Sequence, residues 1–240
     1  MAAALGWGAL SASSLIIGAL LGVAREWPGK LIGSVLAFGA GALISAISFD
    51  LAEEGGRLGG GDSLAIGLAL GALTYFGAHR LVERVGGPRR KAPSAAPDDA
   101  DAGIALALGA FLDGIPEQAV LGIGIAAGPG VSVGLLAAIF VSNLPEAIGS
   151  ASAMKAPPRQ VIRLWIVVAV ICTLATVVGY AIADNVSGDT QAIIDGFAAG
   201  ALLVMLIDSM IPEAARRAGD IAGLLTVLGF AVAAALSTVG

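Results

Sequence analysis

The sequence predicts an all-α, polytopic membrane protein, a bundle of eight transmembrane helices, from three observations. Only 13% of the residues are charged and 57% are hydrophobic, whereas a soluble domain carries about a quarter charged residues. Eight apolar segments are each long enough to cross a bilayer, which takes about 20 residues of helix. Basic residues fall almost entirely in alternate loops. We therefore expect the lipid bilayer to be the partner of the outer surface, and we expect no nucleic-acid partner.

The predicted spans share an apolar character that only short turns interrupt, so the whole chain, residues 1–240, is predicted to be a single transmembrane domain. The spans are 5–24, 31–52, 63–81, 103–127, 131–154, 164–183, 193–211 and 221–239. The one long polar stretch, 84–101, lies between the third and fourth spans and contains two glycines and three prolines. This composition is typical of a flexible loop.

The distribution of Lys and Arg predicts the orientation, because cytoplasmic loops of membrane proteins are enriched in both. With eight spans, 12 of the 13 basic residues fall in one alternate set of loops, and only Arg57 falls in the other. A wrong number of spans would scramble this alternation. We expect both termini outside the cytoplasm, the 84–101 loop inside, and the cytoplasmic (cell) membrane as the location.

Two predicted spans carry acidic residues near the middle of the bilayer, where ionisable groups are costly and usually functional. In the fourth span Asp113 and Glu117 are four residues apart, and in the fifth Asn143 and Glu146 are three apart. Each pair therefore shares one helix face. Because only a short turn joins the two spans, we expect all four side chains to meet at one depth.

A proline precedes each glutamate, Pro116 before Glu117 and Pro145 before Glu146. A proline inside a helix removes one backbone hydrogen bond and bends the chain. Several close carboxylates cannot all stay ionised in a membrane interior without a cation, and oxygen ligands suit divalent metal ions. The alternative is a protonated, hydrogen-bonded network that only ties the two helices together.

Further acidic residues mark a route to and from this predicted centre. Asp50, Glu53 and Glu54 end the second span on the outer side, and Asp208 and Glu213 end the seventh on the inner side. Parts of these two spans also repeat, since Phe38, Gly41, Ala42, Leu43 and Glu54 recur 159 residues later as Phe197, Gly200, Ala201, Leu202 and Glu213. The two spans run in opposite directions, and an inverted repeat around a midplane site is typical of secondary transporters.

The motifs Asp-Gly-Ile-Pro-Glu-Gln at 113–118 and Ser-Asn-Leu-Pro-Glu-Ala at 142–147 resemble those of the ZIP (Zrt/Irt-like) family of divalent metal transporters. The resemblance implies a metal site at Asp113, Glu117, Asn143 and Glu146, with Asp113 where the family usually has histidine. It also implies eight helices with extracytoplasmic termini. Gly114 replaces the usual asparagine, which leaves a second adjoining metal site open, and the loss of imidazole ligands weakens a preference for zinc over iron or manganese.

These observations lead to the hypothesis that the chain transports a divalent metal cation (zinc, iron or manganese) and is not an enzyme. The cation would enter past Asp50, Glu53 and Glu54 and leave past Asp208 and Glu213, as substrate, with no prosthetic group. A proton-coupled carrier of another small solute is the alternative within transport, and an intramembrane enzyme is the alternative outside it. Neither a deep histidine nor a Ser-Lys pair supports the enzyme. A homodimer is left open.

Overall fold

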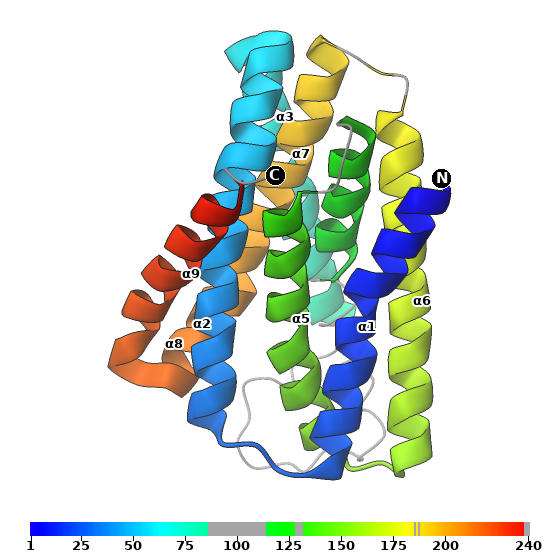
Figure 1. Cartoon of the computed structure of the whole chain (residues 1–240), viewed down its shortest axis with the longest axis vertical. Helices are drawn as coiled ribbons and strands as arrows, with labels where there is room; N and C mark the ends of the chain where they lie inside the picture. The colour runs from blue at the N-terminus through cyan, green and yellow to red at the C-terminus, as the bar shows by residue number, and fades with distance from the viewer. Residues whose placement is uncertain (86–113, 128–131, 185, 187, 238–240) are drawn as a thin grey trace.

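The structure is a computed structural model that describes residues 1–85, 114–127, 132–184, 186 and 188–237, and these residues form helices with no strand among them. Most of these helices are long and apolar, and α1, α2, α5, α6 and α7 run side by side along the long axis of the bundle (Figure 1). In chain order the elements are α1 (Ala2–Ala24), α2 (Gly29–Ala46), the π-helical segment η1 (Ile47–Glu53), α3 (Glu54–Val85), the helix Gly114–Ala127, α5 (Val133–Ala153), α6 (Pro158–Ala183), α7 (Asp189–Met205), the π-helical segment η3 (Leu206–Met210), α8 (Ile211–Ala218), the short 3₁₀ turn η4 (Gly219–Ile221) and α9 (Ala222–Ser237).

Two of the helical runs are far longer than a bilayer is thick. Five runs are long and apolar enough to cross a membrane, and of these Gly29–Leu81 has 53 residues and Asp189–Ser237 has 49. Gly60 (φ 82°) breaks the first run and Gly219 (φ 67°) is the only residue with positive φ inside the second. An L-residue with a side chain rarely adopts this conformation. The described residues thus show five candidate spans where the sequence predicts eight, because two runs each join helices across a glycine.

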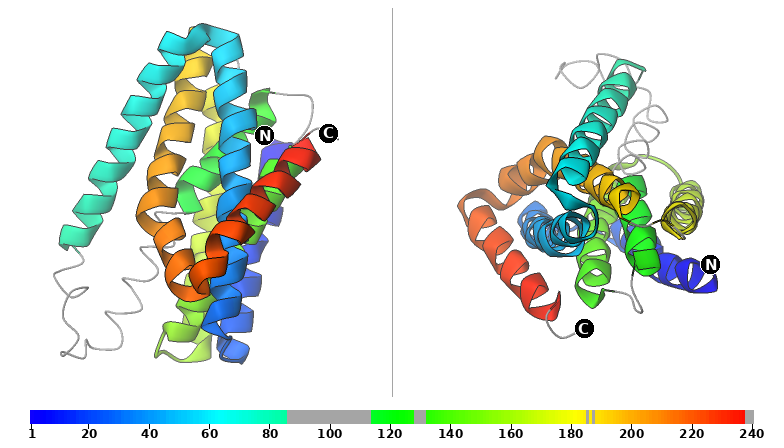
Figure 2. Two further views of the ribbon diagram at one scale, coloured as in Figure 1. Left: turned by 90° about the vertical axis from the view of Figure 1, so that its left-hand side faces the viewer. Right: turned by 90° about the horizontal axis from the view of Figure 1, so that it is seen from above.

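Figure 2 shows how the first of these runs is divided. The chain rises through α2, turns at its upper end and descends through α3 beside α7. We call this end, where α2 and α3 meet, the upper end, and the opposite end, where α1 joins α2, the lower end (Figures 1 and 2).

The outer faces of the helices are apolar. Leu224 is 75% exposed, Leu73 68% and Val227 67%, and they belong to α9 and α3. Exposure of so many large apolar side chains to water is unfavourable, whereas contact of these side chains with lipid is favourable. With the five apolar runs, this surface makes the chain a multi-pass, all-helical membrane protein.

Glycines allow the helices to approach until backbones touch. Gly71 of α3 faces the carbonyl of Phe197 in α7, and Gly229 of α9 faces the carbonyl of Phe38 in α2, each so closely that a Cβ would overlap the oxygen. Gly200 and Gly41 make the reciprocal contacts, with the carbonyls of Leu68 and Thr226. Lipid provides no hydrophobic drive for helix association, so membrane helices associate through van der Waals contacts of this close kind. The α2–α9 and α3–α7 interfaces are built in the same way.

The helices fall into two groups. One contains α2, α3, α7, α8 and α9, and the other contains α1, α5, α6 and, through contacts with α5 and α6, the helix Gly114–Ala127. The groups meet where α2 packs against α5. At this junction Gly39 lies against the backbone of Ser142, and a Cβ at residue 39 would come within 2.9 Å of the Ser142 Cα. The candidate site lies beside this junction.

Candidate functional site

The helix Gly114–Ala127 and α5 are joined by a buried cluster of polar side chains. Glu117 is only 2% exposed, and both of its carboxylate oxygens accept hydrogen bonds from α5. The Ser142 hydroxyl donates to Oε1 at 3.1 Å, and the Asn143 amide donates to Oε2 at 2.8 Å. Ser142 and Asn143 are themselves buried, at 0% and 1% exposed. A carboxylate is therefore held inside an apolar bundle by two donors from a neighbouring helix.

The local sequence of α5 explains why these donors face Glu117. Ser142 and Asn143 also donate to the Ile139 carbonyl, at 2.9 and 3.0 Å, so both side chains are anchored to their own helix. Pro145 lies inside α5 and has no N–H to offer the Val141 carbonyl four residues earlier. The Val141 carbonyl is therefore not used by the helix at this point, one or two residues from Ser142 and Asn143. This turn of α5 has one more free carbonyl oxygen than an ordinary helical turn.

The side-chain oxygen of Asn143 does not take part in the hydrogen bonds of this cluster. Both bonds just described come from its Nδ2, and its Oδ1 is buried with no hydrogen-bond partner in the described part of the chain. Buried polar atoms are nearly always paired, so each exception needs an explanation. An amide oxygen beside a buried carboxylate is a suitable ligand for a hard divalent cation.

Glu146 and Cys172 lie near the cluster. Glu146 is half-buried, and its carboxylate and that of Glu117 both interact electrostatically with Cys172 of α6. Cys172 is fully buried, and a Cβ at Gly114 would lie 3.0 Å from its sulfur. The structure therefore brings Glu117, Asn143 and Glu146 to one region. Asp113, the fourth predicted member, lies outside the described residues.

A second buried connection lies next to Glu117 and was missed by the sequence analysis. The Gln118 amide donates to the Ser11 hydroxyl of α1 at 2.9 Å, and the Thr176 hydroxyl of α6 donates to the Gln118 Oε1 at 2.8 Å. All three side chains are 0% exposed. Neutral Ser, Thr and Gln are common in membrane helices, so only the position of Gln118 directly after Glu117 could have indicated this role.

The predicted route residues lie away from the cluster, at the two ends of the bundle. At the upper end, Asp50 accepts a hydrogen bond from Ser132, the residue that caps α5, at 3.3 Å. Glu54 is paired with Arg57 at 2.5 Å, and Glu53 is exposed. Asp50 and Glu54 are thus bonded to Ser132 and Arg57, which do not belong to the cluster around Glu117.

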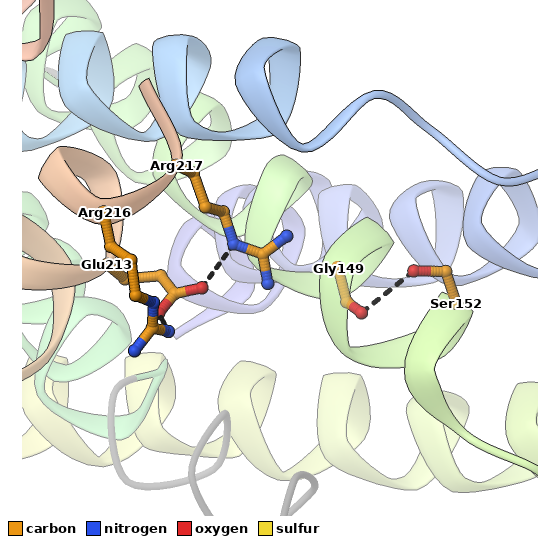
Figure 3. Close-up of polar contacts among 5 residues, drawn as sticks. All are labelled: Gly149, Ser152, Glu213, Arg216 and Arg217. Atoms are coloured by element: carbon orange, nitrogen blue, oxygen red, sulfur yellow. Dashed lines mark hydrogen bonds and ion pairs between the residues drawn. The ribbon is translucent and has the colours of Figure 1, made fainter. Parts of the chain in front are cut away.

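At the lower end, Asp208 is exposed and Glu213 forms ion pairs with Arg216 and Arg217. Figure 3 shows the Arg217 guanidinium reaching from Glu213 toward Gly149 of α5. A Cβ at Gly149 would lie 3.6 Å from the Arg217 Nη2. Arg217 thus extends from one helix group to the surface of the other.

The chain is similar in sequence to a plant protein described as a transporter. No family model matches the chain. Over 200 residues the chain is 30% identical to a protein of Arabidopsis thaliana described as a "putative zinc transporter", and this stretch covers 80% of the chain. The chain spans 31% of the length of that relative. This similarity agrees with the resemblance to the ZIP family.

The polar side chains of the cluster carry oxygen donors. Within the described residues, no group of three or more His, Cys, Asp or Glu side chains lies close enough to hold a metal ion. The oxygen atoms at the cluster come from two carboxylates, an amide and a hydroxyl, on Glu117, Glu146, Asn143 and Ser142. Oxygen donors without imidazole suit harder divalent ions better than they select zinc.

Proposed function

We propose that this chain transports a divalent metal cation across the cytoplasmic membrane through the cluster around Glu117. The observation that carries the proposal is the buried Glu117 carboxylate, 2% exposed, beside an Asn143 oxygen that has no partner among the described residues. A purely structural tie between helices would not require an ionisable group at this depth, because a neutral amide forms the same hydrogen bonds at lower cost. A cation would use the carboxylate and the amide oxygen together.

The metal would be bound by Glu117, Glu146 and Asn143, with Asp113 as a fourth ligand. Arrival of a cation would replace the Ser142 and Asn143 hydrogen bonds, since both carboxylate oxygens are occupied by these donors. A rotation of the Asn143 amide would turn Oδ1 toward the ion in place of Nδ2. The Val141 carbonyl, released by Pro145, supplies further negative potential nearby.

We propose eight spans and a cytoplasmic lower end. Dividing the two long runs at Gly60 and Gly219, and counting the helix Gly114–Ala127 as the described part of a longer span, gives this number. Arg25, Lys30 and Arg216, which lie at helix ends in the described residues, are then at the lower end (Figure 1), in agreement with the preference of cytoplasmic loops for Lys and Arg. Both termini would be extracytoplasmic.

Alternating access would come from movement of the two helix groups against each other. The glycine contacts support an inverted repeat, because Phe38 with Gly41 and Phe197 with Gly200 occupy equivalent places in the two interfaces. The segments η1 and η3 begin at residues 47 and 206, again 159 residues apart. A repeat of this kind lets one group move without remaking its own packing.

The route would run from Asp50, Glu53 and Glu54 at the upper end to Asp208 and Glu213 at the lower end. Each of these residues is partly exposed or paired with a group that a cation could displace, such as Arg57 at Glu54. The cargo would be zinc, iron or manganese. Zinc is the first ion to test because the relative is named for it, although the chain covers only 31% of that protein.

The test is uptake of Zn²⁺, Mn²⁺ and Fe²⁺ into proteoliposomes that contain the full chain. We expect Glu117→Gln and Glu146→Gln to abolish uptake of the transported ion. The matched control is Asp220→Asn, which removes an exposed carboxylate in η4 and should leave uptake unchanged. Size-exclusion profiles of the purified variants report folding.

Three results would contradict the proposal. The first is unchanged metal uptake in both glutamate variants, and the second is an absence of metal uptake by a folded wild-type chain. The third is a proton gradient that drives another solute through the wild type with no metal requirement. That outcome would favour the proton-coupled carrier, in which Glu117 and Glu146 move protons.

A further inference from the structure

A second buried carboxylate lies near the upper end of the bundle, in a different helix interface from Glu117. Asp195 of α7 is 2% exposed, and its Oδ1 accepts a hydrogen bond from the Gln191 amide at 2.8 Å. Its Oδ2 is buried and has no hydrogen-bond partner in the described part of the chain. Leaving a carboxylate oxygen buried and unpaired is unfavourable, so a ligand at this atom would stabilise it.

The unpaired oxygen faces the start of α3. A Cβ at Gly55 would lie 3.5 Å from the Asp195 Oδ2 and 3.0 Å from the Asp195 Cβ, so the absence of a side chain at residue 55 lets α3 approach this carboxylate closely. The carboxylate of the preceding residue, Glu54, interacts electrostatically with Asp195. Glu54 is 30% exposed and is paired with Arg57. Two interacting carboxylates thus lie on either side of the α3–α7 contact at Gly55, one buried and one partly exposed.

Protonation of Asp195 would not satisfy its free oxygen. A proton on Oδ2 would be a hydrogen-bond donor, and no acceptor pairs with that atom among the described residues. A cation, in contrast, uses the lone pairs of Oδ2 directly and relieves the repulsion from Glu54.

We infer that Asp195 and Glu54 form a second binding site for a divalent cation that takes oxygen ligands. Asp195 Oδ2 supplies the buried ligand, Glu54 supplies the exposed one, and water completes the shell, as is usual for hard divalent ions with few protein ligands. Glu54 would exchange Arg57 for the ion, which gives the site an entrance from the upper end. Binding of an ion at this second site does not depend on transport. A role of the site in binding the ion before it reaches Glu117 rests on the proposed function.

The experiment counts bound ions on the purified full chain in detergent, with Mn²⁺ followed by the loss of its free EPR signal. Zn²⁺ is followed in parallel by competition with a chromophoric chelator. We expect Asp195→Asn to bind one ion fewer than the wild type, because asparagine keeps the Gln191 bond but loses the charge. Glu54→Gln should weaken the same site by about tenfold or more. Asp62→Asn, an exposed carboxylate near the same end, is the matched control and should change nothing.

Comparison with Glu117→Gln separates this inference from the proposed function. We expect that variant to lose the central ion and retain the upper one. Equal ion counts and affinities in the wild type, Asp195→Asn and Glu54→Gln would overturn the upper site, and so would a failure of the wild type to bind either metal. Loss of all binding in Glu117→Gln would also overturn it. Loss of the upper ion alone in Asp195→Asn would support it even if no variant transports metal. Glu54→Gln, at a partly exposed position, keeps the test valid if Asp195→Asn does not fold.

Discussion

Asn143 of α5 donates a hydrogen bond of 2.8 Å to the Glu117 carboxylate, and this bond joins the two helices that carry the Pro-Glu motifs. Both residues are buried, so the bond has no water to compete with it. The first prediction therefore concerns this pair. Asn143→Ala removes a donor to a buried carboxylate, which should lower the free energy of unfolding by about 1–3 kcal/mol.

The measurement is denaturant-induced unfolding in detergent micelles, with and without added Zn²⁺ or Mn²⁺. Ser152→Ala is a control, because among the described residues the Ser152 hydroxyl bonds to the Gly149 carbonyl of its own helix (Figure 3). We expect the control to change the free energy of unfolding by less than the Asn143 variant does. Equal stability of Asn143→Ala and the wild type would show that the Asn143–Glu117 bond contributes nothing.

The second prediction concerns the buried connection from Gln118 to Thr176. Thr176→Val keeps the shape of the side chain but removes the donor to the Gln118 Oε1. Hydrogen bonds between membrane helices contribute about 0.6 kcal/mol on average and up to about 1.7, so we expect a loss of about 1 kcal/mol. Thr173→Val is the matched control in the same helix, since the bond described for the Thr173 hydroxyl goes to the Ala169 carbonyl of its own helix. A loss of the same size in both variants would assign the effect to the helix and not to Gln118.

The third prediction concerns the close contact of α3 with α7. Gly71→Ala would place a methyl group on the Phe197 carbonyl, whereas Gly77→Ala, in the same helix, meets nothing within 4 Å. Overpacking costs about 1–3 kcal/mol, and alanine favours a helix by about 1 kcal/mol over glycine. Gly71→Ala should therefore destabilise the protein and Gly77→Ala should leave it unchanged or more stable. Thermal unfolding of the two variants side by side measures the difference.

The membrane character of the chain could be predicted from hydropathy, because each helix needs only an apolar run of sufficient length. The reversal at Gly60 was harder to place, since Gly59, Gly60 and Gly61 all permit it and only the structure shows which has positive φ. The π-helical segments η1 and η3 had no signal in apolar periodicity, although they begin at equivalent positions of the predicted repeat.

The candidate site was predictable where charge made it conspicuous. Pro-Glu spacing on two neighbouring helices indicated that Glu117 and Asn143 would lie close, and a hydrogen bond joins them. Gln118 and Thr176 gave no such signal because they are neutral and their contact depends on how α6 packs. Asp195 was visible as a charge near a helix start, but its burial depends on the approach of Gly55 from α3. The metal-binding role of the cluster remains a prediction.

The fourth prediction concerns the sidedness of the two ends. Lys30 is exposed at the lower end, at the start of α2, and Asp62 is exposed near the upper end, after Gly60. If the basic residues mark the cytoplasmic side, Lys30→Cys in intact cells should resist a membrane-impermeant maleimide and Asp62→Cys should react with it. Cys172, the one native cysteine, is fully buried, so Cys172→Ser provides a background without other thiols.

After the cells are permeabilised, both cysteines should react to the same extent, because both side chains are exposed. This second measurement shows that the lack of reaction at residue 30 comes from the membrane and not from burial. The opposite pattern, with residue 30 reactive and residue 62 protected in intact cells, would reverse the orientation and with it the assigned entry and exit ends. Equal reaction at both positions in intact cells would place residues 30 and 62 on one side, which contradicts a span formed by α2.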